Sequence, residues 1–309
     1  MKRPGYVVLA VVGGAVALGG AGALLGPAWA AAGLVAGPFL ALAAAAAVQG
    51  LAAPDPADLL QAGGHREALR LVDGQLPAWR TAARIWPGQF RDALATQLMN
   101  RSEALLAAHR DGEALAAAEQ GVAIFRSLAA ARPGKPSPDL AGALNNLSYP
   151  LRSAGRQDEA LAAAGEAVQL YQALAAGRPG KYRYRLASSL GTQAELLAQA
   201  GRPGPALAAA SEAAGHYQDM HPADCAASAA EVLFLHGQLL CRASRHREAA
   251  QSLARAWRLS GRITEHQPGF DPAVLRTAYQ ADPAGFLATW HAITGTSPPS
   301  WLTQDDTST

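Results

Sequence analysis

Two Gly-Lys pairs are the residues in this sequence that most resemble a phosphate-binding loop. They are Gly134-Lys135 and Gly180-Lys181. A phosphate loop needs a Ser or Thr directly after the lysine and a glycine five residues before the second one, because the hydroxyl holds Mg²⁺ and the glycine-rich backbone wraps the phosphates. Neither pair has these companions, and each follows a proline. We interpret both pairs as parts of a repeated turn and predict no cofactor.

A second candidate for chemistry is a pair of His–Cys spacings that could hold a metal ion. His221 precedes Cys225 by four residues, and Cys241 precedes His246 by five. A predicted helix over residues 223–242 separates the two pairs by roughly 24 Å, whereas the ligands of one zinc ion converge on a single point. The sequence has no Gly-x-Ser-x-Gly and no His-Glu-x-x-His motif. It therefore predicts neither a metal site nor an enzyme.

Composition indicates a helical protein. The chain has 309 residues, alanine is very abundant, and only 6% of the residues are aromatic. Alanine is the best helix former, so we predict an all-α fold. A formal net charge of +2 is too small to attract nucleic acid, and we predict no nucleic-acid partner. Two cysteines do not make a disulfide framework.

The N-terminal segment is apolar and nearly free of charge. After the cations at positions 2 and 3, no charged residue appears before Asp55. Two apolar runs, residues 6–25 and 28–48, are each long enough to cross a bilayer as a helix. The cations before the first run favour a cytoplasmic N-terminus. We predict a two-helix transmembrane hairpin over residues 1–50, which places the chain at the cell membrane with its repeat domain in the cytoplasm.

Two other interpretations of this segment stay open. Ala28-Trp29-Ala30 has the small-x-small pattern of a signal peptidase site, so the chain could be exported after cleavage near Ala30 or held by a single anchor. The segment could also only touch the membrane, because alanine and glycine drive insertion weakly. Against cleavage, the first apolar run is longer than a usual signal core, and a second apolar run follows the cut.

The rest of the chain repeats itself every 46 residues. An Ala-Leu pair recurs with that spacing and begins at Ala68, Ala114, Ala160 and Ala206. A Pro-Gly pair recurs with the same spacing and begins at Pro87, Pro133 and Pro179. A fifth copy, with Ala249 and Pro268, aligns once three residues are removed from the linker before it. A fixed period of this length is typical of stacked structural units.

Within each unit, apolar residues follow helical spacing. In the third unit, a first helix carries one apolar stripe that ends at Gly155, a helix stop. The stripe consists of Leu140, Leu144, Leu147 and Leu151. A second helix begins near Gln157 and ends before a Pro/Gly-containing link at Pro179. Each unit is therefore a helical hairpin, which can bury its apolar faces only by stacking on its neighbours.

Small residues occupy the positions at which the two helices of a hairpin must cross closely. In the first helices they are Ser102, Ser148, Ala194 and Gly237, and in the second helices Ala114, Ala160, Ala206 and Ala249. This arrangement resembles the tetratricopeptide repeat (TPR), a helix-turn-helix unit with small residues at these places and a proline at its end. The 46-residue unit is similar to the long-unit variety of kinesin light chains and actinobacterial signalling proteins. The resemblance implies a right-handed α-solenoid of about five units over residues 55–268.

The sequence departs from the repeat pattern in three places. Pro54 and Pro56 shorten the first helix of the first unit, Pro150 should kink the first helix of the third unit, and Ser244 in the fifth unit stands where the third has Gly155. After the repeats, Asp-Pro pairs start short helices, which predicts a C-terminal cap over residues 270–294 and a disordered tail over 295–309.

In the repeats that this chain resembles, the first helix of each hairpin lines a concave groove that receives peptides or partner segments. The resemblance places a set of polar residues on that face. They are Asn100, Glu103, Asn145, Asn146, Tyr149, Arg152, Thr192, Glu195, Gln199, Gln238 and Arg242. Asparagine amides can bond both the N–H and the C=O of a peptide. A plain solvated helix face would have the same composition, and that alternative stays open.

The resemblance implies a protein–protein interaction scaffold that binds a protein or peptide partner in the concave groove. The apolar N-terminal segment adds the prediction that this scaffold is tethered to the membrane. The alternative is a regulatory or sensor subunit that controls a partner enzyme or a transcription regulator. An enzyme with a site in the groove is a third possibility. Such an enzyme would need titratable groups clustered in a closed pocket.

Overall fold

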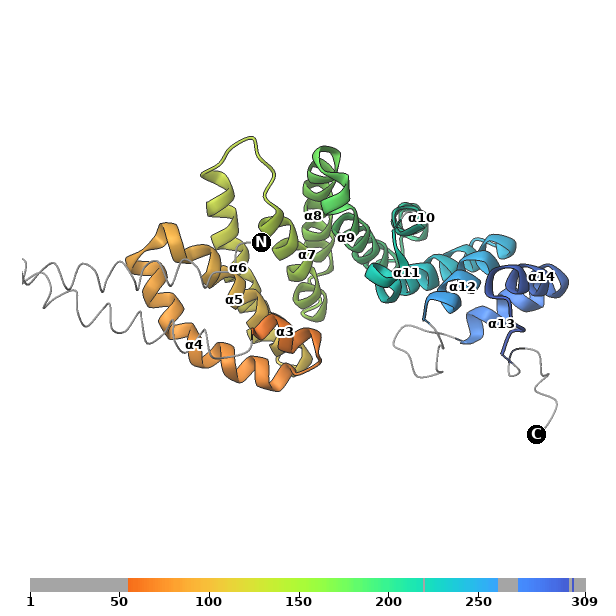
Figure 1. Ribbon diagram of the computed structural model, residues 1–309, viewed down its shortest axis with the longest axis horizontal. Helices are drawn as coiled ribbons and strands as arrows, with labels where there is room; N and C mark the ends of the chain where they lie inside the picture. Colours follow the sequence, from red (N-terminus) through yellow and green to blue (C-terminus); the bar gives the residue numbers. More distant parts are fainter. Residues whose placement is uncertain (1–54, 219, 261–271, 300–301, 303–309) are drawn as a thin grey trace, which may run out of the picture. The chain divides into compact units, whose positions relative to one another are not determined.

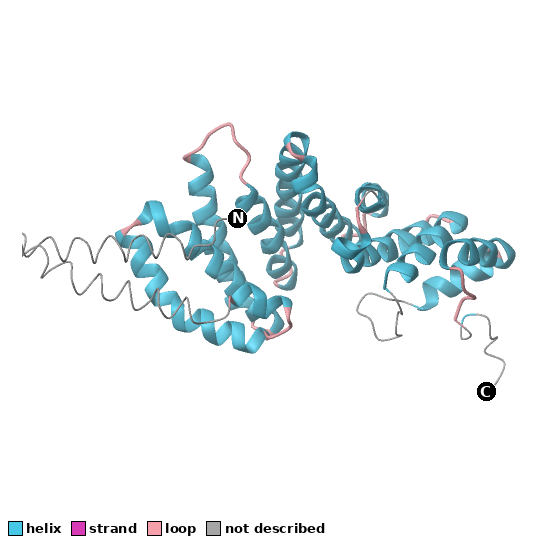
Figure 2. Ribbon diagram, in the orientation of Figure 1, coloured by secondary structure: helices cyan, strands magenta, loops and turns pink. Residues whose placement is uncertain are grey.

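The computed structural model describes residues 55–218, 220–260, 272–299 and 302. In these residues every element of regular secondary structure is an α-helix (Figures 1 and 2), which confirms the predicted all-α class. Contacts between Cα atoms divide the chain after Arg132 into two compact units, residues 1–132 and 133–309. The predicted transmembrane hairpin, residues 1–50, lies outside the described residues, and no helix within them is long and apolar enough to cross a membrane.

The described part of the first unit consists of two helical hairpins. Its helices are α3 (Pro56–Gln61), α4 (His65–Ile85), α5 (Pro87–Ala107) and α6 (Asp111–Ala130). The Asp55 carboxylate accepts a hydrogen bond of 3.0 Å from the Ala57 N–H, and Pro56 fills the first helical position. Helix α3 is only six residues long. Helix α5 packs on both α4 and α6.

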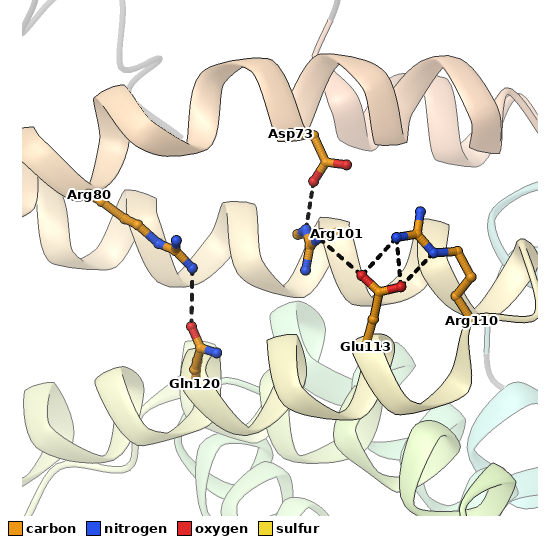
Figure 3. Close-up of polar contacts among 6 residues, drawn as sticks. All are labelled: Asp73, Arg80, Arg101, Arg110, Glu113 and Gln120. Atoms are coloured by element: carbon orange, nitrogen blue, oxygen red, sulfur yellow. Dashed lines mark hydrogen bonds and ion pairs between the residues drawn. The ribbon is translucent and has the colours of Figure 1, made fainter.

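A polar network links the three long helices of this unit (Figure 3). Arg101 on α5 binds Asp73 of α4, with 2.6 Å between Nε and Oδ1, and lies 3.7 Å from Glu113 of α6. Arg101 stands one period before Leu147, so an ionic contact replaces part of the apolar stripe here. Because both carboxylates are more than a third exposed, each pair stabilises the fold by only about 0–1 kcal/mol.

The second unit contains three hairpins and a cap. Its helices are α7 (Pro138–Ser153), α8 (Gln157–Gly177), α9 (Pro179–Gln199), α10 (Pro203–Gln218), α11 (Pro222–Arg242), α12 (His246–Ser260), α13 (Pro272–Ala281) and α14 (Pro283–Thr294). The second helix of one hairpin packs on the first helix of the next, and the first helices also touch one another, α7 with α9 and α9 with α11. This packing places the three first helices side by side.

The same left-handed turn joins the two helices of each described hairpin. In the third repeat, Gly155 has φ +74°, its N–H bonds the Arg152 carbonyl at 2.9 Å, and the Arg156 N–H bonds the Leu151 carbonyl at 2.9 Å. These two bonds satisfy carbonyls that the helix end would leave without partners. Ser244 takes the same conformation with φ +59°. The change from glycine to serine in the fifth repeat therefore alters the residue and leaves the turn in place.

The crossing positions are as small and as buried as the sequence predicts. The second-helix alanines are fully buried at Ala114, Ala160, Ala206 and Ala249. A Cβ atom added to Gly237 would lie 2.7 Å from the Leu253 side chain, so a larger residue does not fit there without movement. In the second repeat, the Ser102 hydroxyl donates a hydrogen bond of 2.8 Å to the Ala114 carbonyl across the crossing.

Two proline positions differ from the simple hairpin-and-link picture. Pro87 and Pro179 were expected in links, but each is the first residue of its helix, α5 or α9. Proline suits this position because its missing N–H would have no helical partner and its φ is already helical.

A third proline, Pro150, lies inside a helix. Helix α7 continues through Pro150 to Ser153, and the Ala154 N–H still bonds the Pro150 carbonyl at 3.0 Å.

The C-terminal helices close the apolar core of the second unit. Phe286 and Trp290 of α14 are almost fully buried, with 1% and 0% of their surface exposed. Asp282 caps α14, since its carboxylate accepts a hydrogen bond of 2.9 Å from the Gly285 N–H. Leu302 belongs to the segment predicted as a disordered tail, yet it is buried in this core with 4% of its surface exposed. Apolar contact thus extends the packed cap at least to this residue.

Ala160→Leu tests the crossing directly. The added volume has no space between α7 and α8, so the free energy of unfolding should fall by about 1–3 kcal/mol. Ala162→Leu adds the same atoms at an exposed position of α8 and should change stability by less than about 0.5 kcal/mol. Urea denaturation followed by circular dichroism measures both values. Equal losses in the two variants would contradict this packing.

Candidate functional site

The residues predicted to line the groove are divided between the two units. Asn100 and Glu103 lie on α5 in the first unit, and the other nine lie on α7, α9 and α11 in the second. Partial burial raises the pKa of the Glu103 carboxyl, and nearby His65 opposes the shift. The Nδ2 atom of Asn100 is buried without a hydrogen-bond partner. The close contacts among predicted residues are in the second unit.

Tyr149 and Thr192 join α7 to α9. The Tyr149 hydroxyl lies 3.0 Å from the Thr192 Oγ1 atom, and Thr192 donates its own hydrogen to the Ser188 carbonyl at 3.2 Å. Tyr149 must therefore be the donor of the contact between the two side chains. Burial raises the pKa of Tyr149, which keeps the phenol protonated and able to donate.

A second contact between the same helices centres on Glu195. Its Oε1 atom accepts hydrogen bonds from the Arg152 guanidinium and, at 3.1 Å, from the Gln199 amide. The guanidinium also lies 5.7 Å from the centre of the Tyr149 ring. Both charged side chains are about one-third or more exposed, so the pair stabilises the fold by no more than about 1 kcal/mol. Its clearer effect is to orient Glu195 and to neutralise its charge.

A pocket of about 270 Å³ lies next to Glu195, between α9 and α11. Four predicted groove residues line its polar edge, namely Glu195, Gln199, Gln238 and Arg242. Its apolar wall consists of Ala198, Leu235 and Leu239. Typical small-molecule sites have volumes of about 300–1,000 Å³, so this pocket is better suited to a side chain of a larger partner.

The two neighbouring asparagines of α7 stand apart from these contacts. Asn146 is exposed, whereas the Oδ1 atom of Asn145 is buried and has no hydrogen-bond partner. A buried oxygen is closed to a ligand, so Asn145 does not present both halves of its amide to a peptide in this conformation. The polar surface that the structure brings together begins at Tyr149 and extends to Arg242.

Residues that sequence reasoning missed contribute to the same surface. Glu231, Leu235, Gln238 and Arg242 follow one another at intervals of four, three and four residues, so they share one face of α11. Burial and the charge of Glu195 both raise the pKa of Glu231. Leu235 stands at the repeat position of Thr192. The helical spacing back from Arg242 was the signal that could have found both residues.

Solved structures of repeat proteins are similar to this chain. BtubC (BKLC) from P. vanneervenii has 20% sequence identity and a TM-score of 0.51, over 74% of this chain and 87% of that one. The nearly identical TPR-like repeats of a kinesin light chain candidate from Podosopora anserina have 15% identity and a TM-score of 0.49, over 67% and 92%. No protein-family model and no curated protein matches the sequence. The chain folds as a TPR-like repeat array.

One Ser–His contact in this TPR-like array is a candidate for nucleophilic chemistry. The His236 ring on α11 lies 2.9 Å from the Ser211 hydroxyl on α10 and 2.9 Å from the Ser252 hydroxyl on α12. Ser211 donates its hydrogen to the Leu207 carbonyl at 2.7 Å, so its oxygen accepts from His236 Nε2. A general base would have to accept from the serine instead. The arrangement therefore links three helices and does not activate Ser211.

The cysteines of the candidate metal site lie in the described part of the chain. The described residues contain no group of three or more His, Cys, Asp or Glu side chains that could hold a metal ion. Neither Cys225 nor Cys241 is in a disulfide, and burial raises the pKa of the Cys241 thiol. A raised pKa lowers the thiolate fraction and hence the reactivity of the sulfur.

The stability of the array should depend on pH through His236. Burial lowers the pKa of its imidazole; Arg245 and Arg255 lower it further, and Glu248 opposes them. The folded protein then binds fewer protons here than the unfolded chain, whose histidine has a pKa of about 6.5. The stability from this group is complete above about pH 6.5 and decreases as the pH falls toward the lower folded pKa. Wild-type stability should thus fall more between pH 7 and pH 5 than that of His236→Gln.

Urea denaturation at each pH measures this difference. His216→Gln is the matched control, because His216 is also partly exposed on a helix of the second unit and has no hydroxyl partner of this kind. Parallel pH profiles for the wild type and His236→Gln would show that His236 is not held neutral by the fold.

Proposed function

We propose that this protein is a membrane-tethered scaffold for protein–protein interaction, and that the face formed by α7, α9 and α11 holds an extended segment of a partner. The pocket between α9 and α11 is the observation that carries this proposal. It combines an apolar wall with amide, carboxylate and guanidinium groups from two adjacent first helices. A segment laid along this face would bury a side chain in the pocket and hydrogen-bond its backbone to the amides at the edge.

The contacts beside the pocket favour the binding of a ligand, because they hold the groove side chains in place. Tyr149, Arg152, Thr192 and Glu195 already hold one another in place, so a ligand meets groups whose positions are set before it arrives. Preorganised groups lose less conformational entropy on binding, which favours affinity. Gln199 and Arg242 are exposed at the edge of the pocket and remain accessible to a partner.

The tether is the second part of the proposal. It rests on the two apolar runs of residues 6–25 and 28–48 and on the absence of charge between them. Both runs belong to the segment predicted to form a membrane hairpin. A hairpin would return the repeat array to the side of the membrane on which the N-terminus lies.

Partner capture from native membranes tests the groove. The full chain and a variant with Gln199→Ala and Arg242→Ala are purified side by side after crosslinking, and the retained proteins are quantified by mass spectrometry. The variant should weaken partner binding by about 1–3 kcal/mol for each buried contact that is lost. Its melting temperature should stay near that of the wild type, since both side chains are exposed.

A matched control carries the same two changes on second helices, Gln169→Ala on α8 and Arg247→Ala on α12, where both residues are also exposed. Partners that depend on the groove should be retained by this control. If the control loses the same partners as the groove variant, or if neither loses any, the binding surface lies elsewhere.

Cell fractionation tests the tether. The full chain should sediment with membranes and stay there after an alkaline carbonate wash, whereas residues 51–309 should be soluble, because the repeats bury their own core. Release of the full chain by carbonate would argue against a spanning hairpin. A mature N-terminus near Ala30, found by mass spectrometry, would instead support an exported protein.

A further inference from the structure

The C-terminal half of α11, which lines the pocket, carries two opposite charges on one face. Glu231 lies near the middle of the helix and Arg242 is its last residue. Their separation along the helix axis is about 16 Å, at about 1.5 Å per residue. Leu235 lies between them on the same face and forms part of the pocket wall, and Gln238 follows it toward Arg242. The charges are therefore ordered along the groove, with an apolar site between them.

Glu231 and Arg242 are also the charged residues of this face that can pair with a ligand. Glu195 and Arg152 are bound to each other, and Gln199 holds the same carboxylate oxygen, so this central pair contributes no net charge. Among the described residues, neither Glu231 nor Arg242 takes part in an ion pair. A ligand along the groove thus meets a carboxylate near one end and a guanidinium near the other.

We propose that the bound segment has the complementary charge order, with a cationic side chain opposite Glu231 and a carboxylate opposite Arg242. Its apolar side chain enters the pocket next to the carboxylate, because Arg242 itself lines the pocket. In an extended segment that runs parallel to α11 and rises about 3.3 Å per residue, the two charges lie about five residues apart. This inference rests on the proposed function and specifies the chemistry of the partner at that same groove.

Charge order gives specificity at this site for a physical reason. A segment with the reversed order would place like charges together at both Glu231 and Arg242, and such juxtaposition is unfavourable. The neutral central pair neither helps nor hinders either order. Discrimination between the two orders therefore depends on Glu231 and Arg242, which lie on one rigid helix at a fixed distance.

A library of random 12-residue peptides displayed on phage provides the test. The purified full chain in detergent micelles is used as bait, beside the single variants Glu231→Lys and Arg242→Glu and the control Arg247→Glu. The wild type and the control should select peptides with Lys or Arg about five positions from Asp or Glu, and with an apolar residue beside the acid. Arg242→Glu should lose the preference for the acid and keep the preference for the cation. Glu231→Lys should lose the preference for the cation and keep the preference for the acid.

Fluorescence anisotropy with a peptide selected by the wild type gives the magnitude. Each charge reversal should weaken binding of that peptide by about fivefold or more. Loss of an exposed ion pair accounts for up to about fivefold, and the reversed charge adds repulsion. A peptide with its own acid changed to lysine should regain affinity for Arg242→Glu. Arg242→Gln and Glu231→Gln, which introduce no repulsion, should show smaller losses in the same order and remain informative if a reversal disturbs folding.

The outcomes separate this inference from the function on which it rests. Peptides that bind the wild type and lose affinity in the Gln199→Ala and Arg242→Ala double variant, but show no charge order, would overturn the inference and leave the peptide-binding groove intact. A library that yields no peptide above background would overturn both. Unchanged affinity in both charge-reversed variants would show that α11 does not read the charge of the ligand.

Discussion

Close crossing of the two helices in each hairpin is the constraint on which the structure depends. Alanines such as Ala160 and Ala206 have no exposed surface, and a side chain at Gly237 would collide with Leu253. Small residues let the backbones approach, and the left-handed turn at positions such as Gly155 returns the second helix onto the first at the required angle. Because the turn and the crossing recur with one period, each hairpin presents the same faces to its neighbours.

This regular stacking determines where the polar groups of the second unit meet. The first helices α7, α9 and α11 touch one another, so a residue of one first helix lies beside a residue of the next that stands about one helical turn earlier in its repeat. Tyr149 reaches Thr192 and Arg152 reaches Glu195, and in each contact the two residues are 43 positions apart in the sequence. The groove is thus a property of the stack, and no single hairpin contains it.

The hydrogen-bonded polar residues of the second unit form two groups: those of the groove and those that pack between helices. The groove contacts leave edge groups such as Gln199 and Arg242 accessible to a partner. His236, in contrast, has both ring nitrogens bound to serines of neighbouring helices and a lowered pKa, which makes it part of the packing. Its neighbourhood resembles a catalytic contact by residue type, but Ser211 accepts from Nε2, and Ser252, which faces Nδ1, is buried away from a substrate.

The sequence by itself determined the periodic features, because each depends on local propensity and spacing: the helical class, the hairpin boundaries around Gly155, and the small residues at the crossings. Only the tertiary structure decided which groove residues meet. It joined Arg152 to Glu195 and buried the Asn145 oxygen. It also drew Leu302 into the cap core. Such outcomes depend on how neighbouring helices pack, and a one-dimensional period does not specify that packing.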